Sequence, residues 1–175
     1  MEEVKDEKGL EIVILGHPAL RKKAEEVKEI DGSIKELVDQ MAYTMYKAKG
    51  LGLAANQVAV LKRVFIIDIS QKENKPLLEV YINPEIVSAE GKIVREEGCL
   101  SIPGYYAKVE RFSRIFIKAY DLKEKLIERE LEGLHAIAFQ HELDHLNGIL
   151  FIDHLSPLKQ ALFKRWWKKH GKKKK

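Results

Sequence analysis

The stretch Gln140-His141-Glu142-Leu143-Asp144-His145 places two histidines four residues apart. If it is helical, both imidazoles lie on one helix face, one turn apart, and can bind the same ion. Glu142 is rotated by about a third of a turn from His141, so it faces a metal-bound water better than the metal itself. The pattern H-E-x-x-H therefore predicts two metal ligands and a general base. The alternative is a polar helix face that carries two histidines by chance.

A third metal ligand must come from elsewhere in the chain, and Cys99 is the candidate. It is the only cysteine, and a lone cysteine is more often an inert core residue. Gly98 precedes it and Pro103-Gly104 follows, so irregular backbone is expected to present the thiolate. One Cys and two His leave the fourth position open for water, which is the arrangement of catalytic sites. The sequence therefore predicts a three-ligand site of Cys99, His141 and His145.

Three motifs together resemble the signature motifs of bacterial peptide deformylases, in the family's order and spacing. They are Gly50-Leu51-Gly52-Leu53-Ala54-Ala55-Asn56-Gln57, the segment EGCLS at 97–101, and HELDH at 141–145. The resemblance extends from residue 14 to residue 159. Only the charged first nine residues and the last dozen look individual.

The resemblance implies a metal-dependent hydrolase that removes the formyl group from the N-terminal formyl-methionine of newly synthesised polypeptides and releases formate. Cys99, His141 and His145 would hold the metal, with water as the fourth ligand. Glu142 would be the general base. The side-chain amide of Gln57 and the backbone N–H of Leu100 would stabilise the developing oxyanion.

The resemblance also implies residues that bind the peptide and residues that support the ligands. The peptide and its methionine side chain would contact Leu51, Gly52, Gly104, Tyr105, Leu134, Ile137 and Ala138. Glu97, Arg111 and Asp144 would orient the ligands through ionic and hydrogen-bonded contacts, the alternative being ordinary surface charges. Tyr106 stands where some family members carry a basic residue, which leaves a substrate contact at that position unsupported.

The identity of the metal is predicted differently by two arguments. Imidazole and thiolate ligands in a tetrahedral set suit zinc. The resemblance implies iron(II), with nickel and cobalt as active substitutes and zinc as a metal that purified protein can also hold. We therefore expect one divalent ion, iron(II).

The length and composition of the chain predict one domain. With 175 residues, 45% of them hydrophobic, the chain is long enough for a sizeable core. The chain contains no run of eighteen apolar residues, so no membrane span is predicted. The acidic first residues do not resemble a signal peptide, and a single cysteine excludes an internal disulfide. The expected location is the cytoplasm.

Basic residues are concentrated at the C-terminus. Residues 164–175 contain eight Lys or Arg and no acid, so the remaining chain carries −4 although the total is +4. We therefore expect a catalytic domain at 1–163 and a basic tail at 164–175 that continues the last helix. The tail is expected either to contact ribosomal RNA or to maintain solubility.

The expected fold class is α+β, with antiparallel sheets packed around a central metal-binding helix and further helices towards both termini. Helices are expected from Ser33, as N-cap, to about Ala48, at 134–146, and from a Ser156 cap with Pro157 first. Strands are expected at 64–69, 77–82, 85–94, 109–120 and 126–131, with turns at 72–75 and 121–124. The short connections favour antiparallel pairing.

Two other functions are consistent with parts of the sequence. An H-E-x-x-H metallopeptidase would take its third ligand from later in the chain, where Asp153, His154 and His170 are available. A nucleic-acid or ribosome-binding module would use its histidines structurally. The module hypothesis leaves Cys99 and Gln57 unexplained.

Overall fold

The computed structural model describes residues 9–70 and 76–171, and the predicted turn at 72–75 lies outside these residues. Its strands are β1 (Gly52–Ala54), β2 (Val64–Ile67), β3 (Glu79–Glu90), β4 (Ile93–Cys99), β5 (Ile102–Arg111), β6 (Arg114–Tyr120) and β7 (Leu126–Glu132). Its α-helices are α1 (Gly32–Lys47), α2 (Leu134–Leu146) and α3 (Pro157–His170). Short 3-10 helices include η1 (Pro18–Arg21), η2 (Ala55–Val58) and η4 (Phe151–His154).

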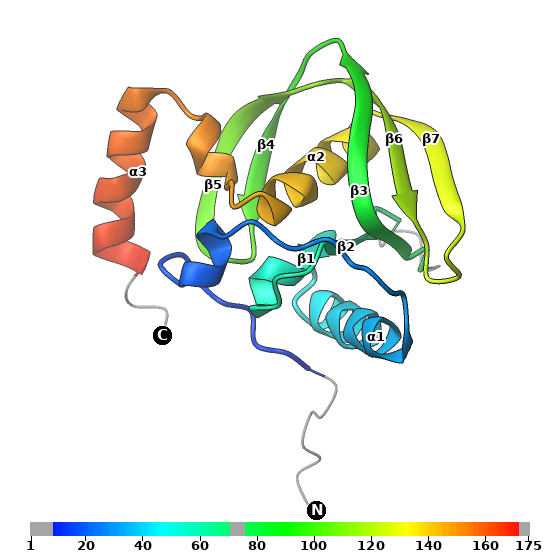
Figure 1. Ribbon diagram of the computed structural model, residues 1–175. Helices are drawn as coiled ribbons and strands as arrows, with labels where there is room; N and C mark the ends of the chain where they lie inside the picture. The colour runs from blue at the N-terminus through cyan, green and yellow to red at the C-terminus, as the bar shows by residue number, and fades with distance from the viewer. Residues whose placement is uncertain (1–8, 71–75, 172–175) are drawn as a thin grey trace, which may run out of the picture.

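The strands form two antiparallel sheets. One has the order β1-β2-β3-β6-β7, and the other is the hairpin β4-β5. Helix α2 runs through the centre, with β4 and β5 on one side and β3, β6 and β7 on the other (Figure 1). The expected α+β class and the antiparallel pairing are confirmed.

Helix α2 begins and ends where the sequence predicts. Its residues Ala136, Phe139 and Leu146 are buried against the large sheet, where Phe139 makes edge-on contacts with Phe65 and Tyr81. The Gln140 side chain bonds both backbone groups of Phe112, at the β5–β6 turn. Its amide oxygen accepts from the Phe112 N–H at 3.0 Å, and its amide nitrogen donates to the Phe112 carbonyl oxygen at 2.8 Å. The helix is thus fixed by apolar burial and by a polar clamp, and its remaining face is available for chemistry.

The first predicted helix has a different N-cap. Asp31, and not Ser33, caps α1: its Oδ1 accepts hydrogen bonds from the backbone N–H groups of Ser33 and Ile34 at 3.0 and 3.3 Å. The Ser33 hydroxyl itself donates to Asp31 at 2.6 Å. A carboxylate is the stronger acceptor at a helix N-terminus, so the prediction of Ser33 is wrong by two residues.

Three predicted strand boundaries are wrong. Strand β3 continues through Asn83-Pro84 as a bulge, because the Asn83 side chain bonds both backbone groups of Val27 at 2.8 and 2.9 Å. The predicted strand 85–94 reverses at Gly91, whose φ is +73°. The predicted strand 109–120 is divided between β5 and β6. A bulge removes the proline from the ladder, so the strand does not have to end there.

The segment around Cys99 is more regular than expected. Cys99 ends β4 and pairs with Ile102 of β5, after a register shift between Glu97 and Cys99. The thiol is therefore presented by a bulged hairpin and not by an irregular loop. Strand β1 was also not predicted. It is the edge strand of the large sheet and pairs only with β2 within the described part of the chain.

Helix α3 begins as predicted, with Ser156 accepting from the Lys159 N–H at 3.2 Å and Pro157 in the first turn. It lies at one side of the molecule, beyond β5 (Figure 1). Its aromatic residues Phe163 and Trp166 contact Tyr105 of β5, with ring centroids 4.6 and 5.1 Å apart. Among residues 9–70 and 76–171, no helix has the length and apolar composition to cross a bilayer.

Candidate active site

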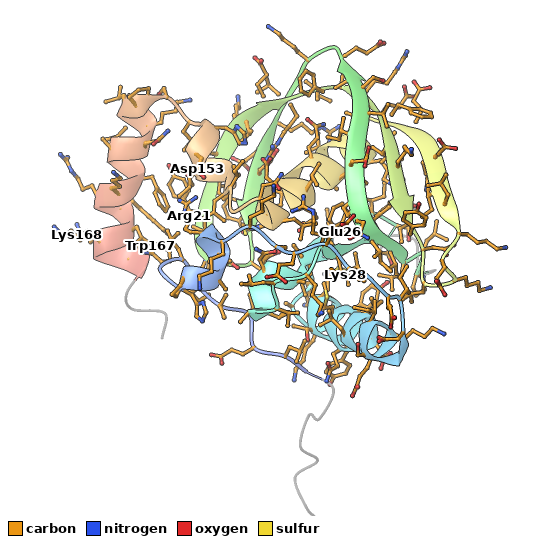
Figure 2. All side chains as sticks on the ribbon, viewed as in Figure 1. Arg21, Glu26, Lys28, Asp153, Trp167 and Lys168 are labelled. Atoms are coloured by element: carbon orange, nitrogen blue, oxygen red, sulfur yellow. The ribbon has the colours of Figure 1, made fainter. Side chains whose placement is uncertain are left out.

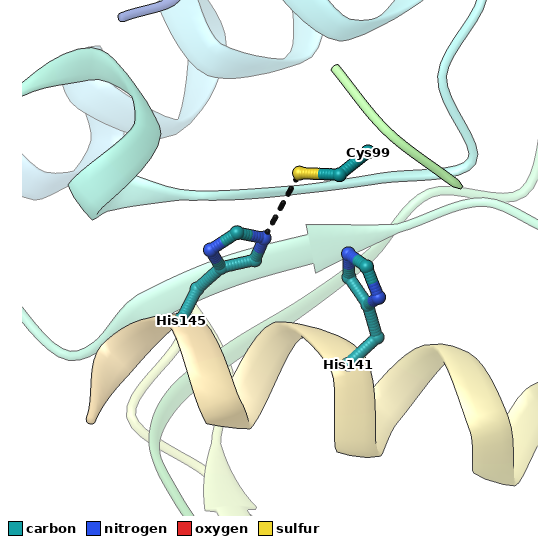
Figure 3. A group of neighbouring side chains, drawn as sticks. All are labelled: Cys99, His141 and His145. Carbon is teal, nitrogen blue, oxygen red and sulfur yellow. Dashed lines mark hydrogen bonds between the residues drawn. The ribbon is translucent and has the colours of Figure 1, made fainter. Parts of the chain in front are cut away.

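Three side chains with metal-binding atoms converge between the hairpin and α2. The ligand atoms of Cys99, His141 and His145 all lie within 4.8 Å of one another, and the Cys99 Sγ is 3.4 Å from the His145 Nε2 (Figure 3). Ligands of a tetrahedral ion at about 2.0–2.3 Å are about 3.5 Å apart, which fits this spacing. No other such group occurs among the residues that the structure describes. The donor set fits one divalent transition-metal ion.

A carboxylate fixes the orientation of His141. Its Nδ1 is 2.9 Å from Glu97 Oε1, which directs the other ring nitrogen towards the thiol. Glu97 in turn accepts two hydrogen bonds from the buried Arg111, at 2.8 and 2.9 Å. Burial alone would raise the pKa of Glu97, but the hydrogen bonds from Arg111 and His141 lower it to about 2. Glu97 is therefore anionic at neutral pH and is placed to orient the His141 ring.

Arg111 connects this carboxylate to the far side of α2. It donates to Asp144 at 2.7 Å, and Asp144 also pairs with His154 at 2.8 Å. The three residues expected to support the ligands, Glu97, Arg111 and Asp144, thus form one connected network. His154 is a member that the sequence did not indicate, because it approaches from η4, outside the motif. A buried arginine shared by two carboxylates is costly to break, so the network should hold α2 and the hairpin in register.

The two ligand histidines differ in their electrostatics. Burial lowers the pKa of His145 well below its usual value, aided by the positive charges of His141 and Arg111. Burial also opposes protonation of His141, but contacts with Cys99 and Glu97 raise its pKa well above the usual value. A divalent ion at the site would take the place of that proton. The Nδ1 of His145 is buried without a hydrogen-bond partner among the described residues.

Glu142 is buried beside the ligands, with 5% of its surface exposed. Its Oε1 has no hydrogen-bond partner within residues 9–70 and 76–171. Burial, the largest cause, raises the pKa of Glu142 to about 7. A cation held by the three ligands would lower this pKa again. A carboxyl group with a free oxygen and a pKa near neutrality is suited to accept and return a proton.

Gln57 lies on η2 and directs its amide group at the ligand sulfur. Its Oε1 accepts from the Ala54 N–H at 3.0 Å, which fixes the amide orientation. Its Nε2 donates to Ser101 Oγ at 3.2 Å and to Cys99 Sγ at 3.5 Å. The structure thus brings the predicted oxyanion donor to the ligand set, together with buried Ser101, which the sequence analysis did not single out. Ser101 lies in the EGCLS motif, and this position was the available signal.

Leu100, the source of the second predicted oxyanion donor, connects β4 to β5. Its side chain packs against the core cluster that includes residues of α1 and β2. It lies so close to Gly50 that a Cβ there would be 2.7 Å from Leu100 Cδ1. A side chain at the first glycine of the G-x-G motif would therefore require the Leu100 side chain to shift.

The residues expected to border the substrate lie on two sides of the ligands. Leu134, Ile137 and Ala138 occupy α2 in the two turns before His141, half-buried except Ile137, which is buried. Leu51 is 41% exposed and leads into Gly52 on the edge strand β1. Gly104 is exposed, but the Tyr105 ring packs on α3. Only the Tyr105 backbone, and not its ring, is therefore placed to meet a peptide.

The later residues that a metallopeptidase would need do not join the ligands. Asp153 forms a bidentate ion pair with Arg21, His154 pairs with Asp144, and His170 stacks on Trp166 at 4.9 Å. Within the described ranges, the residue that completes the candidate metal-binding group is Cys99.

Fold and site together define a metal-dependent hydrolase with a Cys-His-His ligand set and a buried glutamate. The family model described as "Polypeptide deformylase" matches residues 9–161, and the chain belongs to that family. The peptide deformylase of Thermodesulfovibrio yellowstonii is 50% identical over 159 residues, which are 91% of this chain and 96% of the relative. The predicted family and enzyme activity, removal of the N-formyl group from nascent polypeptides, are confirmed.

Solved structures agree with this assignment. A peptide deformylase from Legionella pneumophila has a TM-score of 0.86 and 44% identity, covering 93% of this chain and 95% of that one. A peptide deformylase from Synechococcus elongatus, solved in complex with actinonin, has a TM-score of 0.84 and 39% identity, with 89% and 87% covered.

Proposed function

We propose that Cys99, His141 and His145 hold one iron(II) ion and that Glu142 handles the protons of deformylation. The observation that supports this is the convergence of the three ligand atoms beside a buried carboxyl group with a free oxygen. A bound divalent ion supplies Lewis acidity and a water of lowered pKa. Nickel and cobalt suit the same donor set, and zinc binds it as well.

Glu142 takes a proton from the attacking water while the water oxygen bonds to the formyl carbon. The negative charge that develops on the formyl oxygen is stabilised by the Gln57 amide and the backbone N–H of Leu100. Glu142 then delivers the proton to the leaving nitrogen as the C–N bond breaks. The second proton of the water passes from the formic acid to the amine, so the products are formate and an N-terminal ammonium group, and atoms and charges balance.

The peptide lies extended against the free edge of β1. Gly52 offers backbone hydrogen-bonding groups there, and Gly104-Tyr105 offers them on the opposite side, so the substrate is recognised as an added strand. Leu51, Leu134, Ile137 and Ala138 surround the methionine side chain. A short apolar pocket with backbone recognition explains how one enzyme serves many nascent chains.

Three measurements test the assignment. The protein should hydrolyse formyl-methionyl peptide and leave the same peptide without a formyl group intact, whereas a peptidase would cleave both. Metal analysis should find one ion per chain, and Cys99→Ala should lose it. Actinonin, present in the Synechococcus elongatus complex, should inhibit. Cleavage of the unblocked peptide would contradict the proposal.

We also propose that the enzyme works in the cytoplasm and contacts the ribosome through α3 and the basic tail. The outer face of α3 carries exposed cations, including Arg165 and Lys169. Positive charge on a body that is otherwise negative can approach RNA phosphate while the active site stays free.

Ribosome contact is best tested by substitution and not by truncation. Ending the chain at Phe163 would remove Trp166, which packs on Tyr105. The truncation would therefore disturb β5 next to the expected substrate residues. Arg165→Glu with Lys169→Glu reverses charge without removing an aromatic contact. Co-sedimentation with ribosomes at rising salt should weaken, with free-peptide hydrolysis unchanged. Unchanged sedimentation would leave solubility as the role of the outer cations.

A further inference from the structure

A groove of about 560 Å³ lies between α3 and the body of the protein, away from the metal ligands. Its walls come from Leu15, from η1 and η4, and from α3, which contributes both its inner face and exposed lysines on its flank. They are Leu15, Arg21, Ile152, Asp153, Gln160, Phe163, Lys164, Trp167 and Lys168. Figure 2 shows Arg21 and Asp153 on the body and Trp167 on α3. A volume in the range of small-molecule sites, roughly 300–1,000 Å³, makes this groove a candidate binding site.

The floor of the groove is apolar and aromatic. Phe163 is buried, and the Trp167 ring stacks on it, with centroids 6.0 Å apart and planes 26° apart. Leu15 and Ile152 complete this surface. Trp167 is only half-buried, although it lies beside the core cluster of Phe163. A flat indole at the edge of a cavity favours a ligand with a flat ring.

One charged wall is already organised. Arg21 donates to both carboxylate oxygens of Asp153, at 2.6 and 3.1 Å, and to the carbonyl oxygen of Gly148 at 3.3 Å. The two charges of this ion pair cancel, and three hydrogen bonds from Arg21 fix its geometry. Gln160 donates its amide nitrogen to the carbonyl oxygens of Asp153 and Leu155, which leaves its amide oxygen as an acceptor.

The opposite wall carries unbalanced positive charge. Lys164 and Lys168 lie one helical turn apart, and neither has an ion pair within the part of the chain that the structure describes. Two ammonium groups on the same face favour a dianion between them. An apolar ligand would leave these charges unused, and a bare anion would leave the aromatic floor unused.

We propose that this groove binds a nucleoside monophosphate, with the base against Trp167 and the phosphate between Lys164 and Lys168. A phosphate monoester carries nearly two negative charges at neutral pH, which matches the two lysines. An aromatic side chain stacks on any of the bases, so the site selects phosphate and ring but not one base. Nothing in the deformylation chemistry requires this ligand, because no lining residue belongs to the proposed catalytic machinery.

The first experiment titrates the full-length metal-loaded enzyme with 5′-AMP, adenosine and inorganic phosphate. Tryptophan fluorescence reports on the groove through Trp167, which lines it, whereas the other tryptophan, Trp166, packs on Tyr105. We expect saturable AMP binding at about millimolar concentration or below, and binding of adenosine and of phosphate each weaker by about tenfold or more. Equal affinity for adenosine and AMP would overturn the proposed phosphate position between Lys164 and Lys168. Failure of AMP binding to saturate would overturn the proposal that the groove is a binding site.

Charge-matched variants locate the binding. Lys164→Ala with Lys168→Ala should weaken AMP about tenfold, whereas Arg165→Ala with Lys169→Ala, the same charge loss on the outer face, should change it less than about twofold. Unchanged deformylase activity and metal content in both variants show that the chain is folded. Equal weakening by both pairs would reduce the binding to general charge attraction and overturn the proposal.

The ligand class is tested with two further probes. Calorimetry compares AMP with a short single-stranded oligoadenylate. Binding of the oligonucleotide no tighter than AMP supports a free nucleotide as the ligand. Binding about tenfold tighter or more would identify RNA as the ligand of the groove and overturn the free-nucleotide assignment. Trp167→Leu should abolish the preference for AMP over inorganic phosphate. An acidic peptide that binds more tightly than AMP would overturn the nucleotide assignment.

Discussion

Gly52 lies directly against the carboxylate of Glu142. A Cβ at residue 52 would be 2.5 Å from the Glu142 Oε2, a distance that no packed structure tolerates. Edge strand β1 and the buried glutamate are therefore in direct contact at this glycine. If β1 binds the peptide and Glu142 moves the proton, as proposed, this one contact affects both substrate position and proton transfer.

Gly52→Ala should lower kcat by about 100-fold, because the added methyl group displaces the Glu142 carboxylate. The measurement is steady-state hydrolysis of formyl-methionyl peptide together with metal content, which should stay at the wild-type level. Gly32→Ala is the control, since a Cβ at that first residue of α1 meets nothing within 4 Å. Wild-type kcat in Gly52→Ala would show that Glu142 has room to move without cost.

Glu142→Gln should abolish deformylation, with a loss of about 100-fold or more, because the amide cannot accept the proton. The ligands Cys99, His141 and His145 are untouched, so metal content measured by elemental analysis should be retained. A variant that loses its metal would place Glu142 among the ligands and make its assigned role wrong.

Arg111→Leu should destabilise the protein by about 3–5 kcal/mol, because Glu97 would remain as a buried charge without its partner. Metal affinity should also fall by about 10–100-fold, since Glu97 orients His141. Urea unfolding and metal competition with a chelator measure the two effects. Arg114→Leu removes ion pairs that are half exposed and should cost less than about 1 kcal/mol. Similar losses in the two variants would contradict the support role.

The iron(II) form should be active and should lose activity in air, as the metal and the Cys99 thiolate oxidise. Nickel or cobalt should preserve activity, and zinc should bind but support slower turnover. Activity is compared after chelation and reloading of the same preparation with each metal. Equal activity and equal stability in air of the iron and zinc forms would contradict the preference for iron.

Glu79 should make stability depend on acid pH. Burial alone would raise the pKa of Glu79, but hydrogen bonds from His135 and Tyr81 hold it below the ordinary 4.5. Its stabilising contribution is therefore complete above pH 4.5 and is lost as the pH falls through the lowered pKa.

The free energy of unfolding of the wild type should exceed that of Glu79→Gln at pH 7, and the difference should shrink below pH 4.5. Urea unfolding at a series of pH values gives both curves. Glu128→Gln, at an exposed position of β7, is the control and should show little difference at any pH. A constant difference for Glu79→Gln would contradict the assigned pKa shift.

Much of the site was predictable because its information is local. The spacing of His141 and His145 determines that both face one side of a helix, and α2 has the bounds that the pattern predicts. Cys99 was predictable as a candidate because it is the only thiol in the chain. The cap at Ser156 is equally local.

The parts that could not be predicted depend on partners far away in the chain. The bulge at Asn83 exists because its side chain bonds the backbone of Val27, 56 residues earlier. Prediction of a strand end at Asn83-Pro84 therefore failed. His154 belongs to the network around Arg111 only because η4 packs beside β4 and β5. Its position in the sequence, shortly after the HELDH motif, does not reveal this contact.

What the sequence by itself determined about this protein is its set of chemical groups: the candidate ligands, the expected base, the expected amide donor and the charge of the tail. Only the tertiary structure decided which of these groups meet, that Gly52 touches Glu142, and that α3 stands away from the body far enough to leave a cationic groove. The physical reason is the distance along the chain over which each interaction acts. Helix periodicity and capping act within about one turn of the chain, whereas burial, desolvation and shared carboxylates depend on segments that only the packed core brings together.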